Sequence, residues 1–450
     1  MISRIPSGAY DDIPILVSAD YNAGVSVTLA CLFLLLNSGG AVYLLAQANL
    51  ERWKKIVFAV AALISLALKL ILATRGHNFD LDSYGIVVSL VLHGKSVYAN
   101  TPRFNYGPLW GFILAGIEQL STFLPAMRGE TFHVAVAAFL GITDVALAAL
   151  LSAKYRYGAG IFFLCCPASI LLSGYHSQFE NFALLVGLAS WLLIRSGSPP
   201  PRRLAIAAGL QGISLVIKHV LFLFPLWIFL WTKLGSWRKR VAYVVIAYGI
   251  FGLSFLPWMF DAPSRDGIIR NVFLYRSEFT YSLSRLLTSI SFLAPLTKSE
   301  SAILTLGWIV IVMVAGTIAA QRKVDLFPMY LLAMFTFSPA LRDQYLAIPL
   351  LASAILYTSW PSWALTTAAI VALLSSTYGI FLIPSRFYYT TLVSTQICAA
   401  AFFWVQLPRP GGSRSDPSPT REAVKNAVAL ALCSFALVWV ILQAKAFALL

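Results

Sequence analysis

Long apolar runs separated by short polar segments account for most of the 450 residues of this chain. An α-helix rises about 1.5 Å per residue, so about 20 apolar residues suffice to cross a bilayer. Such runs recur from Val25 almost to the last residue, with no stretch between them long enough for a soluble domain. The predicted spans are residues 24–46, 55–74, 131–151, 158–174, 180–194, 204–218, 220–232, 241–259, 301–319, 326–340, 346–358, 364–382, 390–407 and 426–446. The pattern therefore predicts an all-α polytopic membrane protein with 13–14 transmembrane helices.

The polar segment 75–124 carries two carboxylates, Asp80 and Asp82, directly after a predicted span. A short amphipathic helix is predicted to follow, with Asp82 or Ser83 as its N-cap and Gly94 just beyond its last turn. Capping explains Asp82 as well as any other role, whereas Asp80 lies before the predicted cap. Asp80 is therefore the freer carboxylate and the candidate general base, since a base must reach the proton that it removes.

The run 107–124 decides on which face the loops lie. A full span there would put residues 51–55 and the later basic loops on opposite faces. An interfacial or half-buried hairpin instead places 18 basic and four acidic residues on one face, which holds 14 of the net charge of +15. We adopt the hairpin and expect this face to be cytoplasmic, because basic loops remain on that side. The basic excess then indicates topology and contact with anionic membrane lipids rather than nucleic-acid binding, and both termini are expected outside.

Four polar clusters then fall on the outer face or at its membrane border. They are Asp80 with Asp82, the loop 175–181, Lys218 with His219, and the segment 342–345. A short loop needs polar residues in any case, but the mixture of donors and acceptors in 175–181 suits the hydroxyls of a sugar. Lysine at a helix end usually extends its ammonium to the interface. Two cations on one side, Lys218 and Arg342, nevertheless favour an anionic lipid headgroup as ligand.

Two further features have both a structural and a functional interpretation. Tyr106 precedes Gly107 and Pro108, and a turn with an aromatic interface belt is the simpler account of this stretch. Asp144 lies within a predicted span, where an ionisable side chain is costly and faces a partner or a cavity. A Lys or Arg from another helix is at least as good an explanation for Asp144 as a direct role in a site.

Composition supports the membrane assignment, with 59% hydrophobic and 11% charged residues, against roughly 45–50% and 25% in soluble domains. All five cysteines lie in apolar runs, which is typical of small buried side chains rather than disulfides or metal ligands. The absence of an Asn-x-Ser/Thr sequon favours a bacterial plasma membrane over the endoplasmic reticulum. The first 22 residues lack a basic segment, so we expect no cleaved signal peptide there.

The chain divides into one transmembrane domain, residues 1–408, a cytoplasmic linker at 409–424 and a terminal helix at 425–450. Within the domain, the outer loop 75–124 is the predicted catalytic loop. A second outer loop at 260–300 carries several arginines, and we expect it to cover the site as a lid or to bind the acceptor.

Several short motifs together resemble the GT-C glycosyltransferases that use polyprenyl-phosphate sugars, nearest to bacterial glycosyltransferase family 87 and the GPI mannosyltransferases. The motifs are Asp80-Leu81-Asp82-Ser83-Tyr84, Gly94-Lys95-Ser96-Val97-Tyr98, Asn105-Tyr106-Gly107-Pro108, His176-Ser177-Gln178-Phe179-Glu180-Asn181, and Lys218 ahead of Pro225. Asp144 resembles an aspartate found between the first two regions. Ser177 stands where the family usually has Gly, Glu180 where it usually has Asp, and one extra span precedes the first outer loop.

The resemblance implies a GT-C-like fold and an inverting transfer of mannose or another hexose or pentose to a lipid-linked or cell-envelope glycan acceptor. It implies Asp80 as general base, Asp82 as an auxiliary or metal-contacting group, and Lys218, His219 and Arg342 as ligands of the donor phosphate. The residues expected to line the sugar or the acceptor are Tyr84, Tyr106, His176, Gln178, Glu180, Asn181 and Tyr345. Any Mg²⁺ or Mn²⁺ would be held by Asp80 and Asp82. We expect a monomer with its active site on the extracytoplasmic face.

Two other functions fit the pattern less well. A transporter or flippase of a lipid-linked sugar would show inverted repeats and broken helices at matching positions in two halves, and the sequence has no such pairing. An O-antigen-type polymerase would show larger arginine-rich outer loops, which only residues 261–285 approach.

Overall fold

The computed structural model describes residues 19–122, 131–274, 297–322, 324–339, 341–377, 385–407 and 419–448. These residues form helices and no strands, which confirms the all-α prediction. Five of the described helices are long and apolar enough to cross a membrane. They are α1 (Ala19–Gln47), α2 (Arg52–Ala73), α6 (Thr131–Lys154), α16 (Lys298–Gln321) and α21 (Pro419–Ala448). The membrane-protein character is thus supported, whereas the count of 13–14 spans stays a prediction.

Most other predicted spans are shorter or broken helices. The run 158–174 forms two helices bent by 57°, because Pro167 lacks an N–H and cannot continue the first helix. The remaining elements of the first half are α7 (Tyr157–Cys165), α8 (Pro167–Gly174), α9 (Glu180–Ile194), α10 (Pro201–Ile217), η1 (His219–Leu221), α11 (Phe224–Leu230) and η2 (Thr232–Leu234). The second half contains α12 (Trp237–Leu253), α13 (Leu256–Met259), α14 (Ala262–Ile268), η3 (Ile269–Phe273), α17 (Leu326–Phe337), η4 (Asp343–Leu346), α18 (Ala347–Ile355), α19 (Trp360–Ser376) and α20 (Ser385–Gln406).

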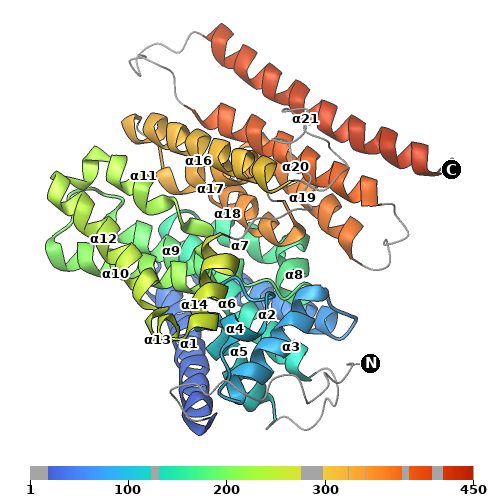
Figure 1. Ribbon diagram of the computed structural model, residues 1–450. Coiled ribbons are helices and arrows are strands. Elements are labelled where there is room, and N and C mark those ends of the chain that lie inside the picture. Colours follow the sequence, from blue (N-terminus) through green and yellow to red (C-terminus); the bar gives the residue numbers. More distant parts are fainter. Residues whose placement is uncertain are drawn as a thin grey trace.

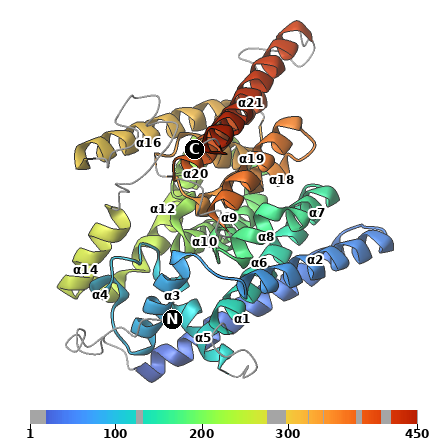
Figure 2. The same cartoon turned by 90° about the vertical axis from the view of Figure 1, so that its right-hand side faces the viewer.

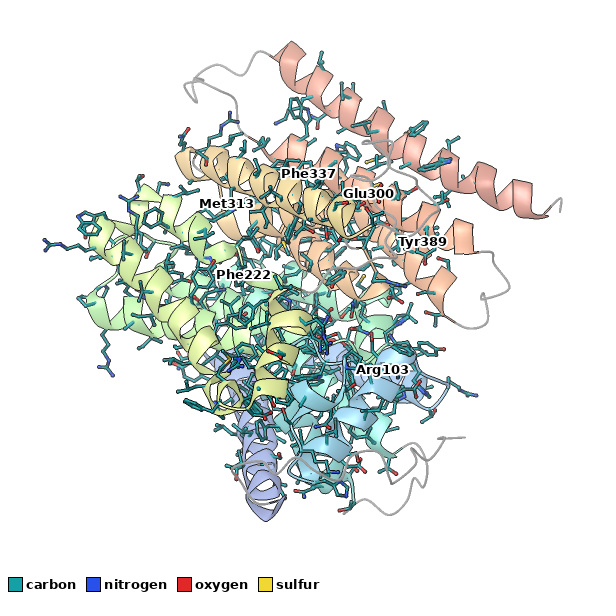
Figure 3. All side chains as sticks on the ribbon, viewed as in Figure 1. Arg103, Phe222, Glu300, Met313, Phe337 and Tyr389 are labelled. Atoms are coloured by element: carbon teal, nitrogen blue, oxygen red, sulfur yellow. The ribbon has the colours of Figure 1, made fainter. Side chains whose placement is uncertain are left out.

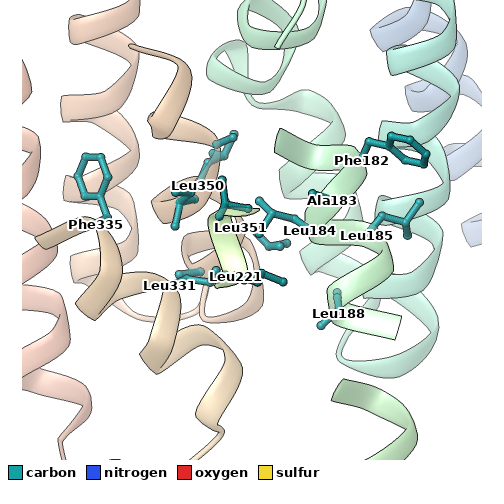
Figure 4. Packing of buried hydrophobic residues seen from close by; sticks show 14 of the residues in the cluster. Phe182, Ala183, Leu184, Leu185, Leu188, Leu221, Leu331, Phe335, Leu350 and Leu351 are labelled. Atoms are coloured by element: carbon teal, nitrogen blue, oxygen red, sulfur yellow. The ribbon is translucent and has the colours of Figure 1, made fainter. Parts of the chain in front are cut away.

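Helix α9 lies in the apolar centre of the molecule. Its buried face packs toward η1, α17 and α18, as Figure 4 shows for the labelled residues around Leu184 and Leu351. The same helix begins with the polar pair Glu180 and Asn181, of which 0% and 1% are exposed. The hydrophobic core therefore holds the polar start of α9 deep inside the protein.

The terminal helix α21 lies at the opposite edge of the molecule from α1 and packs along α20 (Figures 1 and 2). Lys425 Nζ donates to the carbonyl oxygens of Val405 and Leu407 at 2.7 and 2.5 Å. Residues 419–424 belong to this helix, so the predicted linker 409–424 is too long. Proline is favoured in the first helical turn, and Pro419 begins α21. The rest of the linker, 409–418, lies outside the described residues.

The polar segment 75–124 forms three short helices, α3 (Phe79–Leu92), α4 (Val97–Asn100) and α5 (Pro108–Ser121). The predicted N-cap of α3 is wrong: Asn78 caps the helix, and its Oδ1 accepts from the backbone N–H of Asp80 at 3.1 Å. Asparagine caps a helix as well as aspartate does, so α3 starts three residues before the predicted cap and Asp80 lies in its first turn. Gly94 follows the C-cap with φ 67°, as predicted.

Helix α5 contains 14 residues, about 21 Å of helix, which is too short to cross a bilayer. Trp110, Ile113 and Leu114 on it are fully buried, and the helix packs against α1 and α3. The segment is therefore a single helix enclosed by the protein, so the predicted hairpin is wrong, and the topology derived from it stays a prediction.

Several of the basic loops contact one another. Tyr157 Oη donates to the carbonyl oxygen of Lys54 at 3.0 Å, and Arg195 Nη2 donates to that of Lys154 at 2.9 Å. The backbone N–H of Ser198 donates to the carbonyl oxygen of Lys233 at 2.9 Å. These loops therefore gather at one end of the helices.

The second outer loop is described only in part. Helix α14 lies beside α4 (Figures 1 and 2), and Ser264 Oγ donates to Ser96 Oγ at 2.6 Å. This contact ties the start of the loop to segment 75–124. Residues 275–296, with most of the predicted lid, lie outside the described residues.

Candidate functional site

Asp80 is half-buried in the first turn of α3 and is held through one of its two oxygens. Its Oδ2 accepts from Gln178 Nε2 at 2.6 Å and from Asn78 Nδ2 at 3.3 Å. Within the described part of the chain, Oδ1 accepts no hydrogen bond. The carboxylate is thus oriented at one oxygen, while the other is open to a hydroxyl.

The carboxylate of Asp82 points away from that of Asp80. Residues two apart on a helix point about 200° apart, and Asp82 is 57% exposed and pairs with His77 Nε2 at 3.0 Å. The predicted pair of metal-contacting carboxylates therefore does not converge on one point. Among the described residues, no three His, Cys, Asp or Glu side chains lie close enough to share a metal ion. The residues present do not fit an ion bridged by Asp80 and Asp82.

His176 is buried in the loop between α8 and α9 and contacts three elements. Its Nε2 lies 2.9 Å from the hydroxyl of Thr377, which itself donates to the carbonyl oxygen of Leu373. The hydroxyl must therefore accept from His176 Nε2–H. His176 Nδ1 lies 3.4 Å from both Asn78 Nδ2 and Asp343 Oδ2. Burial lowers the pKa of His176, whereas the carboxylates of Asp343 and Asp80 oppose that shift.

Ser177 has φ 50°, in the left-handed region that favours glycine. Its carbonyl oxygen accepts from Tyr84 Oη at 3.3 Å. Gly at this position of the resembled motif would adopt the same conformation without strain. The turn at Ser177 brings Gln178 to Asp80 while the chain continues into α9.

Lys218 and Glu180 form a buried ion pair, with Nζ and Oε1 2.5 Å apart and side chains only 3% and 0% exposed. The ammonium also lies 4.7 Å from the ring centre of Tyr106 and 4.3 Å from that of Phe179. Such cation–π contacts strengthen when water is excluded. The lysine is therefore fixed in place. The sequence position suggested that its ammonium extends to the membrane interface, and it does not.

A close approach of two backbones places Tyr106 beside Lys218. A Cβ atom on Gly107 would lie 2.0 Å from the carbonyl oxygen of Val216, two residues before Lys218. Only glycine fits at this distance. The Gly107-Pro108 turn therefore packs directly on the end of α10.

A cavity of about 280 Å³ opens beside Lys218. Its lining includes a group around Lys218 that we call its polar end, Asn105, Tyr106, Lys218, His219 and Tyr345. It also includes Ser301, Thr305, Ser338 and many apolar residues, among them Phe222, Phe251, Val272, Phe273, Trp308, Ile309, Met334, Phe335 and Ile348. Phe222, labelled in Figure 3, packs against Tyr248 and Phe251 of α12. His219 Nδ1 is buried and has no hydrogen-bond partner among the described residues. The cavity thus suits an amphipathic ligand with a long apolar part and a polar head.

Tyr106 connects the cavity to Asp80. Burial raises the pKa of Tyr106 well above its usual range, and the charges of Asp80 and Glu180 add to that shift together with Tyr84 and Tyr345. The ring of Tyr106 lies 4.9 Å from that of Phe179, whose neighbour Gln178 holds Asp80. Tyr106 therefore lies between the cavity that it lines and the residues that orient Asp80.

Asp144 has the structural partner that the sequence left open. Its Oδ2 lies 2.9 Å from Lys69 Nζ and accepts from Ser173 Oγ at 2.7 Å, while Oδ1 accepts from Asn181 Nδ2 at 2.9 Å. Lys69 and Asp144 are both 0% exposed. Asn181 therefore faces α6, and it is not among the residues that line the cavity.

Sequence reasoning missed three residues at this site, Asn78, Lys69 and Thr377. Lys69 had a signal, since it is a lone charge in the apolar run 55–74. Arg342 is half-buried beside η4 and does not line the described cavity. From the predicted segment 342–345, it is Tyr345 that reaches the cavity and Asp343 that reaches His176.

Comparison of the chain with protein-family models, curated proteins and solved structures finds no match. Its function therefore has to be argued from the chemistry of the site.

Proposed function

We propose that the protein is an integral-membrane inverting glycosyltransferase. It moves a sugar from a polyprenyl-phosphate donor to a lipid-linked or cell-envelope glycan acceptor on the extracytoplasmic face. The observation that carries this proposal is the apolar cavity lined by the buried Lys218, whose partner Glu180 lies two residues after the Gln178 that holds the half-buried carboxylate of Asp80.

The cavity accounts for donor binding. Its aromatic and aliphatic walls take the first isoprene units, and burial of each CH₂ contributes about 0.8 kcal/mol. The phosphate lies at Lys218, whose ammonium donates to a phosphate oxygen as it does to Glu180. His219 Nδ1, which lacks a partner among the described residues, faces the same end.

Asp80 supplies the chemistry. The acceptor hydroxyl attacks the anomeric carbon, and its proton passes to Asp80 Oδ1. The bond between that carbon and the phosphate oxygen breaks, and its electron pair leaves with the lipid phosphate. One displacement inverts the configuration and needs one base, which contributes typically 10²–10⁴-fold to the rate. Gln178 and Asn78 hold the carboxylate by Oδ2 during this step.

The gathered basic loops support the assignment of faces. They contact one another at one end of the helices, and basic loops are retained in the cytoplasm. The polar clusters around Asp80 are the loops that the predicted topology places on the other face.

Purified protein given a synthetic short-chain polyprenyl-phosphate sugar tests the proposal. Wild type is expected to form a glycoside of inverted configuration, and Asp80→Asn to lose at least 100-fold in turnover. Asp82→Asn is the matched control, because Asp82 lies on the same helix but pairs with His77 away from Asp80. Retained turnover in Asp80→Asn contradicts the role of the base. Movement of the lipid-linked sugar across vesicles without any glycoside would instead identify a transporter.

A further inference from the structure

The polar end of the cavity has an unusual charge balance. Among its described lining residues, Lys218 is the only one with a permanent positive charge. Directly behind it, Glu180 binds the same ammonium through Oε1, while its buried Oε2 has no hydrogen-bond partner among the described residues. An anion that reaches Lys218 therefore meets a cation already neutralised by a fixed carboxylate.

Other charges near Glu180 reinforce this balance. Lys218, just after α10, pairs with Glu180, and the charge of Asp80 on α3 also acts on it. Tyr84 and Tyr106 pack against Phe179, the residue before Glu180. Asp80 adds a second carboxylate, and the tyrosines are neutral. The neighbouring pair of Lys69 and Asp144 cancels itself. Within the described ranges, the polar end does not offer two positive charges to a ligand.

The two lipid phosphates of the proposed reaction differ in charge. The donor is a phosphodiester with one negative charge at any pH near neutrality. The product is a phosphomonoester, whose second ionisation has a pKa of about 6, so it carries close to two negative charges at pH 7 and above. The transfer step itself creates this second charge, since the bonding electron pair stays on the phosphate as the acceptor proton passes to Asp80.

We propose that Glu180 makes the site selective for singly charged phosphodiesters over doubly charged phosphomonoesters, and thereby promotes departure of the lipid phosphate product. This inference rests on the proposed function. Glu180 does not line the cavity, so it acts through Lys218 and through its own charge. Repulsion from Glu180 about 6 Å away, at an effective dielectric constant of about 20, lowers the binding constant for an extra unit charge about a hundredfold and offsets the attraction of that charge to Lys218.

Inhibition of sugar transfer by two probes tests the proposal, and direct binding to the same protein runs in parallel. Farnesyl phosphate is a monoester, and methyl farnesyl phosphate is a diester with the same tail. In the wild type, the inhibition constant of the monoester is expected to rise at least tenfold from pH 5.5 to pH 8. The diester is the control for titration of the protein, because both probes meet the same protein groups. The quantity compared is the ratio of the inhibition constant of the monoester to that of the diester. A ratio that does not change with pH in the wild type overturns the inference and needs no variant.

Glu180→Gln keeps the shape and an acceptor oxygen for Lys218 but removes the charge. It is expected to strengthen binding of the monoester at pH 8 at least tenfold more than binding of the diester, and to strengthen product inhibition of turnover more at high pH than at low pH. Glu180→Asp is the matched control that keeps the charge, and it is expected to keep the wild-type ratio of the two probes. An unchanged ratio in Glu180→Gln, or the same change in Glu180→Asp, means that the pair is only structural.

The two proposals fail in different ways. If the wild type transfers sugar and binds the diester but does not discriminate by charge, only the selectivity of Glu180 is wrong. If the wild type binds neither ester and transfers no sugar, the proposed function is wrong and the inference is wrong with it.

Discussion

Replacement of Asp144 by leucine tests the buried network beneath the site. The Lys69–Asp144 pair joins α2 to α6, and Asp144 also accepts from Asn181, the neighbour of Glu180 on α9. The change to Leu leaves the Lys69 ammonium with only the hydroxyl of Ser65, 3.0 Å away, in a place with no exposure. We expect this variant to be strongly destabilised.

The magnitude follows from which partners each change leaves behind. Removal of one member of a buried ion pair costs about 3–5 kcal/mol, because the other charge remains buried. Asp144→Leu and Lys69→Met should each fall in that range. Lys69→Met costs less, since Ser173 and Asn181 still donate to the carboxylate. The double variant removes both charges and leaves only neutral donors unsatisfied, at about 1–3 kcal/mol.

Equilibrium unfolding in detergent measures all four proteins. The expected order of the free energy of unfolding is wild type, then the double variant, then Lys69→Met, then Asp144→Leu. The double variant should therefore be more stable than either single one, which requires a coupling of several kcal/mol. A double variant that loses the sum of the two single losses would show that the charges are not paired, and would refute this account of the network.

Three other changes test other parts of the site. Gly107→Ala brings a Cβ to 2.0 Å from a backbone oxygen at the end of α10 and should raise the KM for the donor at least tenfold. Gly85→Ala, where a Cβ meets nothing within 4 Å, should leave the KM unchanged. Equal effects of the two changes would contradict the close approach at Gly107. Thr305→Trp fills the cavity from α16 and should weaken donor binding with little change in unfolding temperature. Thr317→Trp, on the exposed side of that helix, should leave donor binding unchanged. Unaltered donor binding in Thr305→Trp would place the tail elsewhere. Burial holds the pKa of His176 below its unfolded value, so the unfolded chain binds more protons and stability falls as pH drops below about 6.5. His176→Gln should reduce this loss. Identical pH profiles of unfolding free energy for wild type and variant would show that His176 does not titrate on unfolding.

The apolar pattern predicted the fold class but not the shape of the helices. Runs such as 158–174 are long enough to read as spans, yet Pro167 breaks that one at 57°. The short elements after α10 likewise depend on packing against α17, where Tyr330 Oη accepts from the N–H of Leu223 and donates to the carbonyl oxygen of Val220. Hydrophobicity alone does not record where a helix bends, because an apolar residue suits both sides of the bend.

The charge count predicted which loops share a face. It placed the loops of Asp80, His176, Lys218 and Tyr345 on one face, and the described structure brings Asp80, His176 and Gln178 into contact and Lys218 and Tyr345 to one cavity. Which partner each side chain takes was beyond the sequence. Any of several residues fits chemically as a cap or counter-ion, and only the packed backbone selects among them.

A structure with a bound donor analogue tests the central claim most directly. The measurement is an electron cryomicroscopy map of the protein with a polyprenyl phosphonate sugar, in which a carbon replaces the oxygen that links sugar to phosphorus. The account predicts the phosphonate in hydrogen-bond reach of Lys218 Nζ, the tail between Phe222 and Trp308, and Asp80 Oδ1 facing the anomeric carbon from the side opposite the phosphonate. A phosphonate bound away from Lys218, or a sugar beyond reach of Asp80, would contradict it.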